Sequence, residues 1–121
     1  MPYTVHGRNA MLDALCKGEA PKAIDRVSLH DAEPNAEGSN EIEGGEYARQ
    51  AIAFNAAAEG SSDDSTNGAE FKVPEGATVK FVGFWSDAEG TPKFEGFDEV
   101  TEESFGGAGT YTLTDADLSI T

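Results

Sequence analysis

The sequence is poor in cysteine, in basic residues and in long apolar runs. A single cysteine, Cys16, excludes an intramolecular disulfide and a cysteine-rich zinc site. Only 8 Lys and Arg stand against 23 Asp and Glu, and the net charge of −15 repels phosphate groups, so we expect neither nucleic acid nor an anionic membrane as a partner. No apolar run approaches the roughly 20 residues that cross a bilayer, and the first residues do not resemble a signal peptide.

The residues that are present are enough for one thin core. Of 121 residues, 38% are hydrophobic, and the aromatic residues are seven Phe, three Tyr and one Trp. A second independent core would not fit into this length. We therefore expect one domain, residues 1–121, made of an N-terminal helical segment (1–20) and a β-sandwich (21–121).

The negative charge is concentrated in the larger part of the chain. Residues 1–30 carry a net charge of +1, whereas residues 31–121 hold four basic and twenty acidic residues, a net charge of −16. Such crowding opposes the compact state in dilute salt, and screening at about 1 M salt relieves it. A halophilic source is one hypothesis. The alternative is an acidic surface that only favours solubility. A free energy of unfolding that does not rise with NaCl would exclude the first.

The N-terminal segment predicts one helix over residues 4–17. Met11, Leu12, Leu15 and Cys16 recur at helical spacing. Thr4 is a candidate N-cap. The helix should end at Gly18, which suits the position after a helix, and Pro21 prevents its continuation.

Beyond Pro21 the pattern is that of short strands. We expect strands at 24–30 and 46–57, separated by a long polar connection at 31–46, and a second polar loop at 59–68. Further short strands are predicted at residues 92–97, 100–105, 109–114 and 117–121.

The clearest predicted hairpin joins residues 71–73 to 78–86 through Pro74-Glu75-Gly76, a turn signal. Strand 78–86 is apolar on both faces, so it should be central and covered on both sides, or covered on one side by a partner subunit. The predicted fold class is mainly β, a small β-sandwich or barrel-like sheet pair with one N-terminal α-helix.

Four segments together resemble a family of small virion proteins of tailed viruses, known as phage tail fibre-like or minor tail proteins. They are HGRNAMLDAL (6–15), SLHDAEP (28–34), NEIEGGEYARQ (40–50) and FKVPEGATV (71–79), which runs on to VGFW (82–85). The segments lie within about residues 5–86, and the C-terminal third shares none of them.

This resemblance implies a structural, non-enzymatic component of a tailed-virus particle, located in the virion and bound to major capsid or tail proteins. A homo-oligomer, a trimer in particular, would let a small core gain buried area. Two alternatives stay open: a capsid decoration or turret protein, and a host-attachment module that binds carbohydrate or a cation. The sequence holds no nucleophile elbow, phosphate-binding glycine loop or paired-histidine metal motif, so we expect no enzyme.

Two sets of residues are candidate cation sites. Asp63, Ser65 and Asn67 match the front of a calcium-binding loop, although Pro74 stands where the bidentate acid would be; a solvated loop is the alternative. The second set is the acidic connection, with Asp31, Glu33, Glu41, Glu43 and Glu46. His6, His30 and Cys16 do not have zinc-ligand spacing, and a hydrogen-bonded structural role for His30 is the better interpretation.

The candidate interface residues are six apolar residues and one positively charged residue, Arg49. Arg49 lies among many carboxylates and is expected to pair with Glu41 or Glu43, which would fix the connection against the strand; a contact across a subunit interface is the alternative. The remaining candidates lie on the near-neutral helix and on the aromatic strand: Met11, Leu12, Leu15, Phe81, Phe84 and Trp85.

Overall fold

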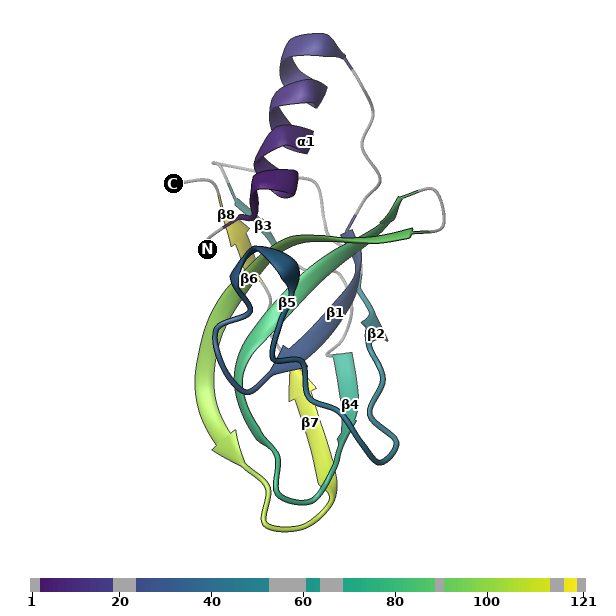
Figure 1. Ribbon diagram of the computed structural model, residues 1–121, viewed down its shortest axis with the longest axis vertical. Coiled ribbons are helices and arrows are strands. Elements are labelled where there is room, and N and C mark those ends of the chain that lie inside the picture. Colours follow the sequence, from purple (N-terminus) through teal and green to yellow (C-terminus); the bar gives the residue numbers. More distant parts are fainter. Residues whose placement is uncertain are drawn as a thin grey trace.

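The computed structural model describes residues 3–18, 24–52, 61–63, 69–88, 91–113 and 117–119. The fold is mainly β with one N-terminal helix, as the sequence predicts (Figure 1). In chain order the elements are α1 (Val5–Lys17), β1 (Ile24–His30), the 3-10 turn η1 (Asn35–Glu37), β2 (Gln50–Ala51), β3 (Ser61–Asp63), β4 (Ala69–Val73), β5 (Thr78–Ala88), β6 (Thr91–Ser104), β7 (Gly109–Leu113) and β8 (Asp117–Ser119).

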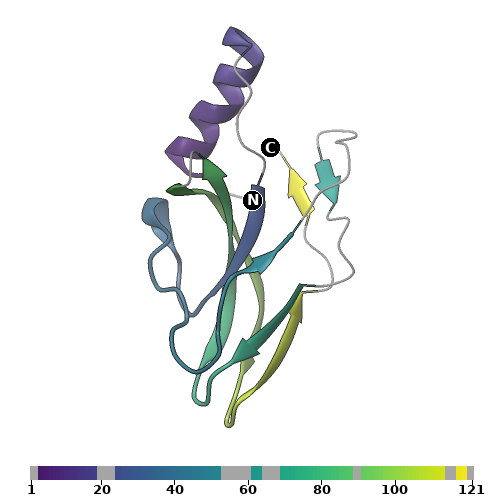
Figure 2. The same ribbon diagram turned by 90° about the vertical axis from the view of Figure 1, so that its right-hand side faces the viewer.

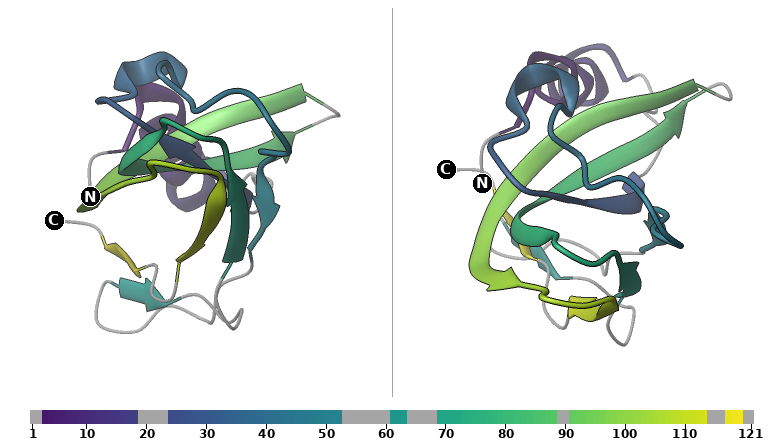
Figure 3. Two further views of the ribbon diagram at one scale, coloured as in Figure 1. Left: turned by 90° about the horizontal axis from the view of Figure 1, so that it is seen from below. Right: turned by 60° about the horizontal axis from the view of Figure 1, so that its bottom comes forward.

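The strands form one larger sheet and two strand pairs, all antiparallel. The larger sheet has the order β2-β1-β5-β6, and the two pairs are β4–β7 and β3–β8. The β4–β7 pair lies on one side of the larger sheet, and the connection that contains η1 lies on the other (Figures 2 and 3). The described strands therefore make a layered sheet structure and not a closed barrel, so the sandwich form of the prediction is the correct one.

Strand β5 is the centre of the larger sheet, with β1 and β6 as its neighbours. Alternate side chains of β5 enter two apolar clusters on opposite faces of the same sheet, since successive residues of a strand point to opposite faces. Val82 and Phe84 join the larger apolar cluster against β4 and β7. Trp85 joins a smaller cluster with Phe94 and Phe97 on the other face. The prediction of a central strand covered on both faces is confirmed within one chain.

The predicted hairpin between residues 71–73 and 78–86 is wrong in its pairing. Both strands and the turn exist, but β4 pairs with β7, and β5 pairs with β1 and β6. The turn at Pro74–Gly76 carries the chain from one layer to the other. It is anchored by the Gly76 N–H, which donates to the Phe105 carbonyl oxygen at 2.8 Å. The turn sequence specifies a reversal, and the burial of both faces of β5 decides which strands pair.

Several strand boundaries also differ from the prediction. The segments 92–97 and 100–105 form one strand, β6, whose pairing with β5 shifts register at two places. Of the strand predicted at 46–57, only Gln50–Ala51 forms β2, and residues 53–57 lie outside the described residues. β3 lies within the predicted loop at 59–68. The helix has the predicted extent, with Thr4 as N-cap and Gly18 in the left-handed conformation at its end.

Helix α1 is attached to the sheet by its first turn. The Thr4 N–H donates to the Glu95 carbonyl oxygen at 3.0 Å, and the Thr4 hydroxyl donates to the Phe94 carbonyl oxygen while it accepts from the Gly7 N–H. Gly7 is the one buried residue of α1, because its backbone lies directly against Glu95 of β6. From this contact the helix projects away from the sheets (Figures 1 and 2).

Gly7→Ala is expected to destabilise the protein although alanine favours helices. An added Cβ would approach the Glu95 carbonyl oxygen well inside 3.0 Å, so α1 or β6 must move, and such overpacking costs about 2 kcal/mol. The helix-propensity gain of about 1 kcal/mol opposes this and is smaller. Urea unfolding measures the difference, with Gly107→Ala as the control at an open position. A Gly7→Ala protein as stable as the wild type would contradict the docked geometry.

Candidate functional site

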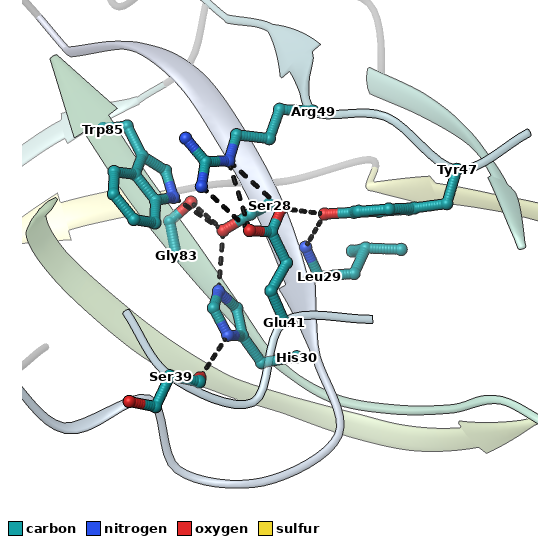
Figure 4. Close-up of polar contacts among 9 residues, drawn as sticks. All are labelled: Ser28, Leu29, His30, Ser39, Glu41, Tyr47, Arg49, Gly83 and Trp85. Carbon is teal, nitrogen blue, oxygen red and sulfur yellow. Dashed lines mark hydrogen bonds and ion pairs between the residues drawn. The ribbon is translucent and has the colours of Figure 1, made fainter. Parts of the chain in front are cut away.

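A cluster of polar side chains lies between the larger sheet and the connection that covers it (Figure 4). We call it the polar cluster; its members are Ser28, His30, Glu41, Tyr47, Arg49 and Trp85. The alternation of β1 produces it, because Val27 and Leu29 point into the larger apolar core while Ser28 and His30 point to the opposite face. Glu41, Tyr47 and Arg49 come from the connection that crosses this face.

His30 and Ser28 belong to a chain of hydrogen bonds in which every group has a defined role. Nδ1 of His30 lies 2.8 Å from the Ser39 carbonyl oxygen, which can only accept, so Nδ1 carries the proton. Nε2 therefore accepts from the Ser28 hydroxyl at 2.7 Å. The Ser28 oxygen in turn accepts from the Trp85 indole N–H at 2.8 Å. The predicted structural role of His30 at a strand end is confirmed.

His30 is held neutral by its surroundings. Burial lowers the pKa of the imidazole, since the charged form would lose its hydration. The space around it depends on Gly83 of β5, where an added Cβ would lie 2.7 Å from His30 Nε2 and from the Ser28 hydroxyl oxygen. Glycine at this position lets the strand backbone pass beneath the two side chains.

Arg49 pairs with Glu41, one of the two carboxylates expected from the sequence. Its Nη2 lies 2.9 Å from Glu41 Oε1 and its Nε lies 3.1 Å from Oε2, a two-point contact. The guanidinium also stacks on the indole of Trp85, with Cζ 3.7 Å from the ring centroid.

Tyr47 completes this contact and links it to β1. Its hydroxyl donates to Glu41 Oε2 at 2.7 Å and accepts from the Leu29 N–H at 2.9 Å. Burial raises the pKa of Glu41, but the hydrogen bonds from Arg49 and Tyr47 outweigh it, so the pKa of Glu41 is lowered overall. The pKa of Tyr47 is raised, chiefly by burial.

This arrangement is buried within the chain. Ser28 and His30 are adjacent as in a nucleophile–base pair, but both are 0% exposed, and the serine hydroxyl is fully engaged. A sugar-binding surface would need accessible aromatic faces. Trp85 is 8% exposed and covered by Arg49, and the hydroxyl of Tyr47 makes two hydrogen bonds within the chain. The polar cluster therefore offers no open ligand site.

The candidate cation residues receive no support from the described part of the chain. Ser65 and Asn67 lie outside the described residues, and Asp63 is described only as the last residue of β3. Both ring nitrogens of His30 are hydrogen-bonded. Among the residues that the structure describes, no group of three His, Cys, Asp or Glu side chains could hold a metal ion.

The aromatic strand is not an exposed interface. Phe84 and Trp85 are buried inside this chain, which corrects their prediction as interface residues, and Phe81 is half-buried against the Trp85 cluster. The doubly apolar strand is satisfied by two layers of its own chain and needs no partner to cover it.

Helix α1, in contrast, exposes its apolar side chains. Leu12 is 57% exposed and Leu15 85%, and Val5, which the sequence interpretation did not select, is 56% exposed. Met11 is half-buried. We call Val5, Leu12 and Leu15 the helix stripe. Among the described residues, these three are the exposed large hydrophobic side chains.

Glu95 is a buried carboxylate that sequence patterning could not identify, because it sits in a strand rich in acidic residues. The Ser86 hydroxyl donates to its Oε2, and Nε2 of His6 lies 3.4 Å from the same oxygen. His6 belongs to α1, and the Glu95 backbone accepts from Thr4. This residue therefore joins the helix to β6 through both its side chain and its main chain.

The chain matches a known protein family over most of its length. The family model described as Podophage GP4 fiber I protein gp80 matches residues 2–109, a span that includes α1, the larger sheet and β4. No curated protein matches the chain significantly. None of the helices in the described residues has the length and hydropathy needed to cross a membrane.

Arg49→Lys is expected to lower the free energy of unfolding by about 1–2 kcal/mol, because lysine cannot reproduce the two-point contact or the stacking on Trp85. Denaturant unfolding gives the value. Arg26→Lys is the matched control: Arg26 is exposed and lies 3.9 Å from Asp25, so a change within about 0.5 kcal/mol is expected there. Equal effects of the two substitutions would show that the Arg49 contact contributes nothing specific.

Stability should fall as pH drops below 6.5, the ordinary pKa of histidine. Since the pKa of His30 is lowered in the folded state, the unfolded chain binds more protons in this range, and His30 contributes a slope of at most about 1.4 kcal/mol per pH unit, the value for one full proton. His30→Asn should lower stability at pH 7 and flatten this slope. Urea unfolding between pH 7.5 and 5 on the two proteins, at values spaced about half a unit apart, tests the account; an unchanged slope in His30→Asn contradicts it.

Proposed function

Because the chain belongs to the podophage GP4 fiber I protein gp80 family, we propose that it is a structural subunit of a tail fibre assembly that docks through helix α1. The family is one of structural proteins of tailed-virus particles, so the chain is a virion component. Docking through α1 means that the sheets form a rigid body and the helix forms the contact with other virion proteins.

The observation that carries the proposal is the location of the exposed apolar side chains. Exposed apolar surface that is concentrated in one place marks an interaction site, whereas scattered single residues do not. In the described residues, the large exposed hydrophobic side chains all lie on α1, whose first turn is docked on the sheet.

The charge distribution supports the same assignment. Residues 31–121 carry a net charge of −16, so a contact through the sheets would bring this charge out of water or close to other acidic surfaces. Helix α1 holds Arg8, Lys17 and one acid, Asp13, and can be covered at a smaller desolvation cost.

A capsid decoration protein would dock in a similar manner, so copy number distinguishes the two positions. A tail fibre subunit should be present in small multiples of the tail symmetry, whereas a decoration protein approaches the number of capsid subunits. Quantitative mass spectrometry of purified particles provides this count.

Leu15→Lys and Leu12→Lys are expected to reduce incorporation into particles by at least about tenfold, because a charge in a desolvated contact costs well over 1.4 kcal/mol. The folded protein should be unaffected, since both side chains face solvent in the free chain. Ala14→Lys places the same charge at an exposed position nearly opposite the stripe and should enter particles normally. Immunoblots of purified particles measure incorporation, and normal incorporation of the two leucine variants would overturn the proposed function.

A further inference from the structure

The helix stripe has the spacing of a helix–helix contact. Val5, Arg8, Leu12 and Leu15 are separated by three, four and three residues, which places them on one side of α1, and all four are exposed. This is the narrow pattern of a two-helix seam, whereas a helix that packs on a globular core has a wider apolar face. Gly7, which contacts β6, lies on a different side of the helix. The stripe is therefore free while α1 stays docked to its own sheet.

The side chains of two helix stripes are complementary when the helices run antiparallel. In an antiparallel pair centred near Ala10, Val5 of one helix lies beside Leu15 of the other, and Arg8 lies beside Leu12. The guanidinium of Arg8 is turned toward the helix start, where Nη1 donates to the Tyr3 carbonyl oxygen at 2.8 Å, so its methylene groups are left to cover the neighbouring leucine.

Electrostatics selects the antiparallel arrangement. We call the part of the chain beyond residue 30, with its net charge of −16, the acidic body. The helix starts at the acidic body, and its C-terminal end points away from it (Figure 2). Antiparallel pairing puts the two acidic bodies at opposite ends of helices about 20 Å long, beyond the screening length of about 8 Å at physiological salt. It also brings Lys17 at each helix end toward the acidic body of the other copy. Parallel pairing would set two bodies of net charge −16 side by side.

We propose that two copies of this protein pair through their helix stripes in an antiparallel, two-fold symmetric contact. This inference rests on the proposed function, in which α1 is the docking surface, and it names the partner as a second copy of the chain. Such a contact is smaller than the roughly 800 Å² per partner of a standard interface, so pairing is weak in dilute solution. The local concentration within a particle strengthens it.

Cysteine cross-linking tests the pairing because Cys16 is exposed and borders the stripe. In the antiparallel pair, Cys16 of one copy lies near Val5 of the other, while the two Cys16 residues are about 18 Å apart along the helices. Val5→Cys should therefore give a disulfide-linked dimer under mild oxidation, in at least about tenfold higher yield than the wild type.

Two further variants serve as controls. Ala14→Cys adds a cysteine nearly opposite the stripe and should give only the collisional background of the wild type. Leu12→Lys in the Val5→Cys background should return the yield to that background without loss of folding, which circular dichroism checks.

The outcomes separate this inference from the proposed function. Efficient linkage between two Cys16 residues in the wild type would show a parallel contact and overturn the antiparallel pairing. Background yield in Val5→Cys, together with failure of Leu15→Lys to enter particles, would overturn self-pairing and assign the helix to a different virion protein. Normal entry of Leu15→Lys into particles would overturn the proposed function itself.

Discussion

Burial of both faces of strand β5 is the constraint on which the rest of the structure depends. One face carries Val82 and Phe84, and the β4–β7 pair covers it. The other carries Trp85, and the connection between β1 and β2 covers it. That connection is rich in glycine and acidic residues, and it buries Pro34 and Ile42. The two-point contact between Arg49 and Glu41 lies within the connection. Tyr47 and the backbone of Ile42 link the connection to Leu29 of β1, and the Arg49 guanidinium rests on Trp85 of β5.

The sheets and helix α1 use their apolar side chains in different ways. In the sheets, the aromatic residues are used for packing, and the buried serine, histidine and indole groups satisfy one another. The surface of the sheets is acidic, and the polar cluster beneath the connection offers no open ligand site. Helix α1 differs in each respect: it is close to neutral, it contacts the sheet through Thr4 and Gly7, and its leucines face solvent. In the proposed function, the sheets are the rigid body of this virion protein and α1 is its docking element.

Local sequence signals predicted the elements that depend on local physics. The limits of α1, the strand at 24–30, the turn at Pro74–Gly76 and the central place of β5 followed from capping, alternation and turn chemistry. The pairing of Arg49 with Glu41 followed from the scarcity of positive charge. Strand partners did not follow, because a turn sequence fits a hairpin and a crossing between layers equally well. The burial of Phe84 and the role of Glu95 depended on which strands lie opposite each other, and only the assembled sheet determines that.

Amide hydrogen exchange on the free protein and on purified particles tests the central claim most directly, because it reports where the chain becomes covered on assembly. The account predicts that the amides of α1 around Leu12 and Leu15 exchange at least about tenfold more slowly in the particle, while those of β5 are protected equally in both. Unchanged exchange in α1, with new protection confined to the exposed strands of the sheets, would contradict assembly through the helix.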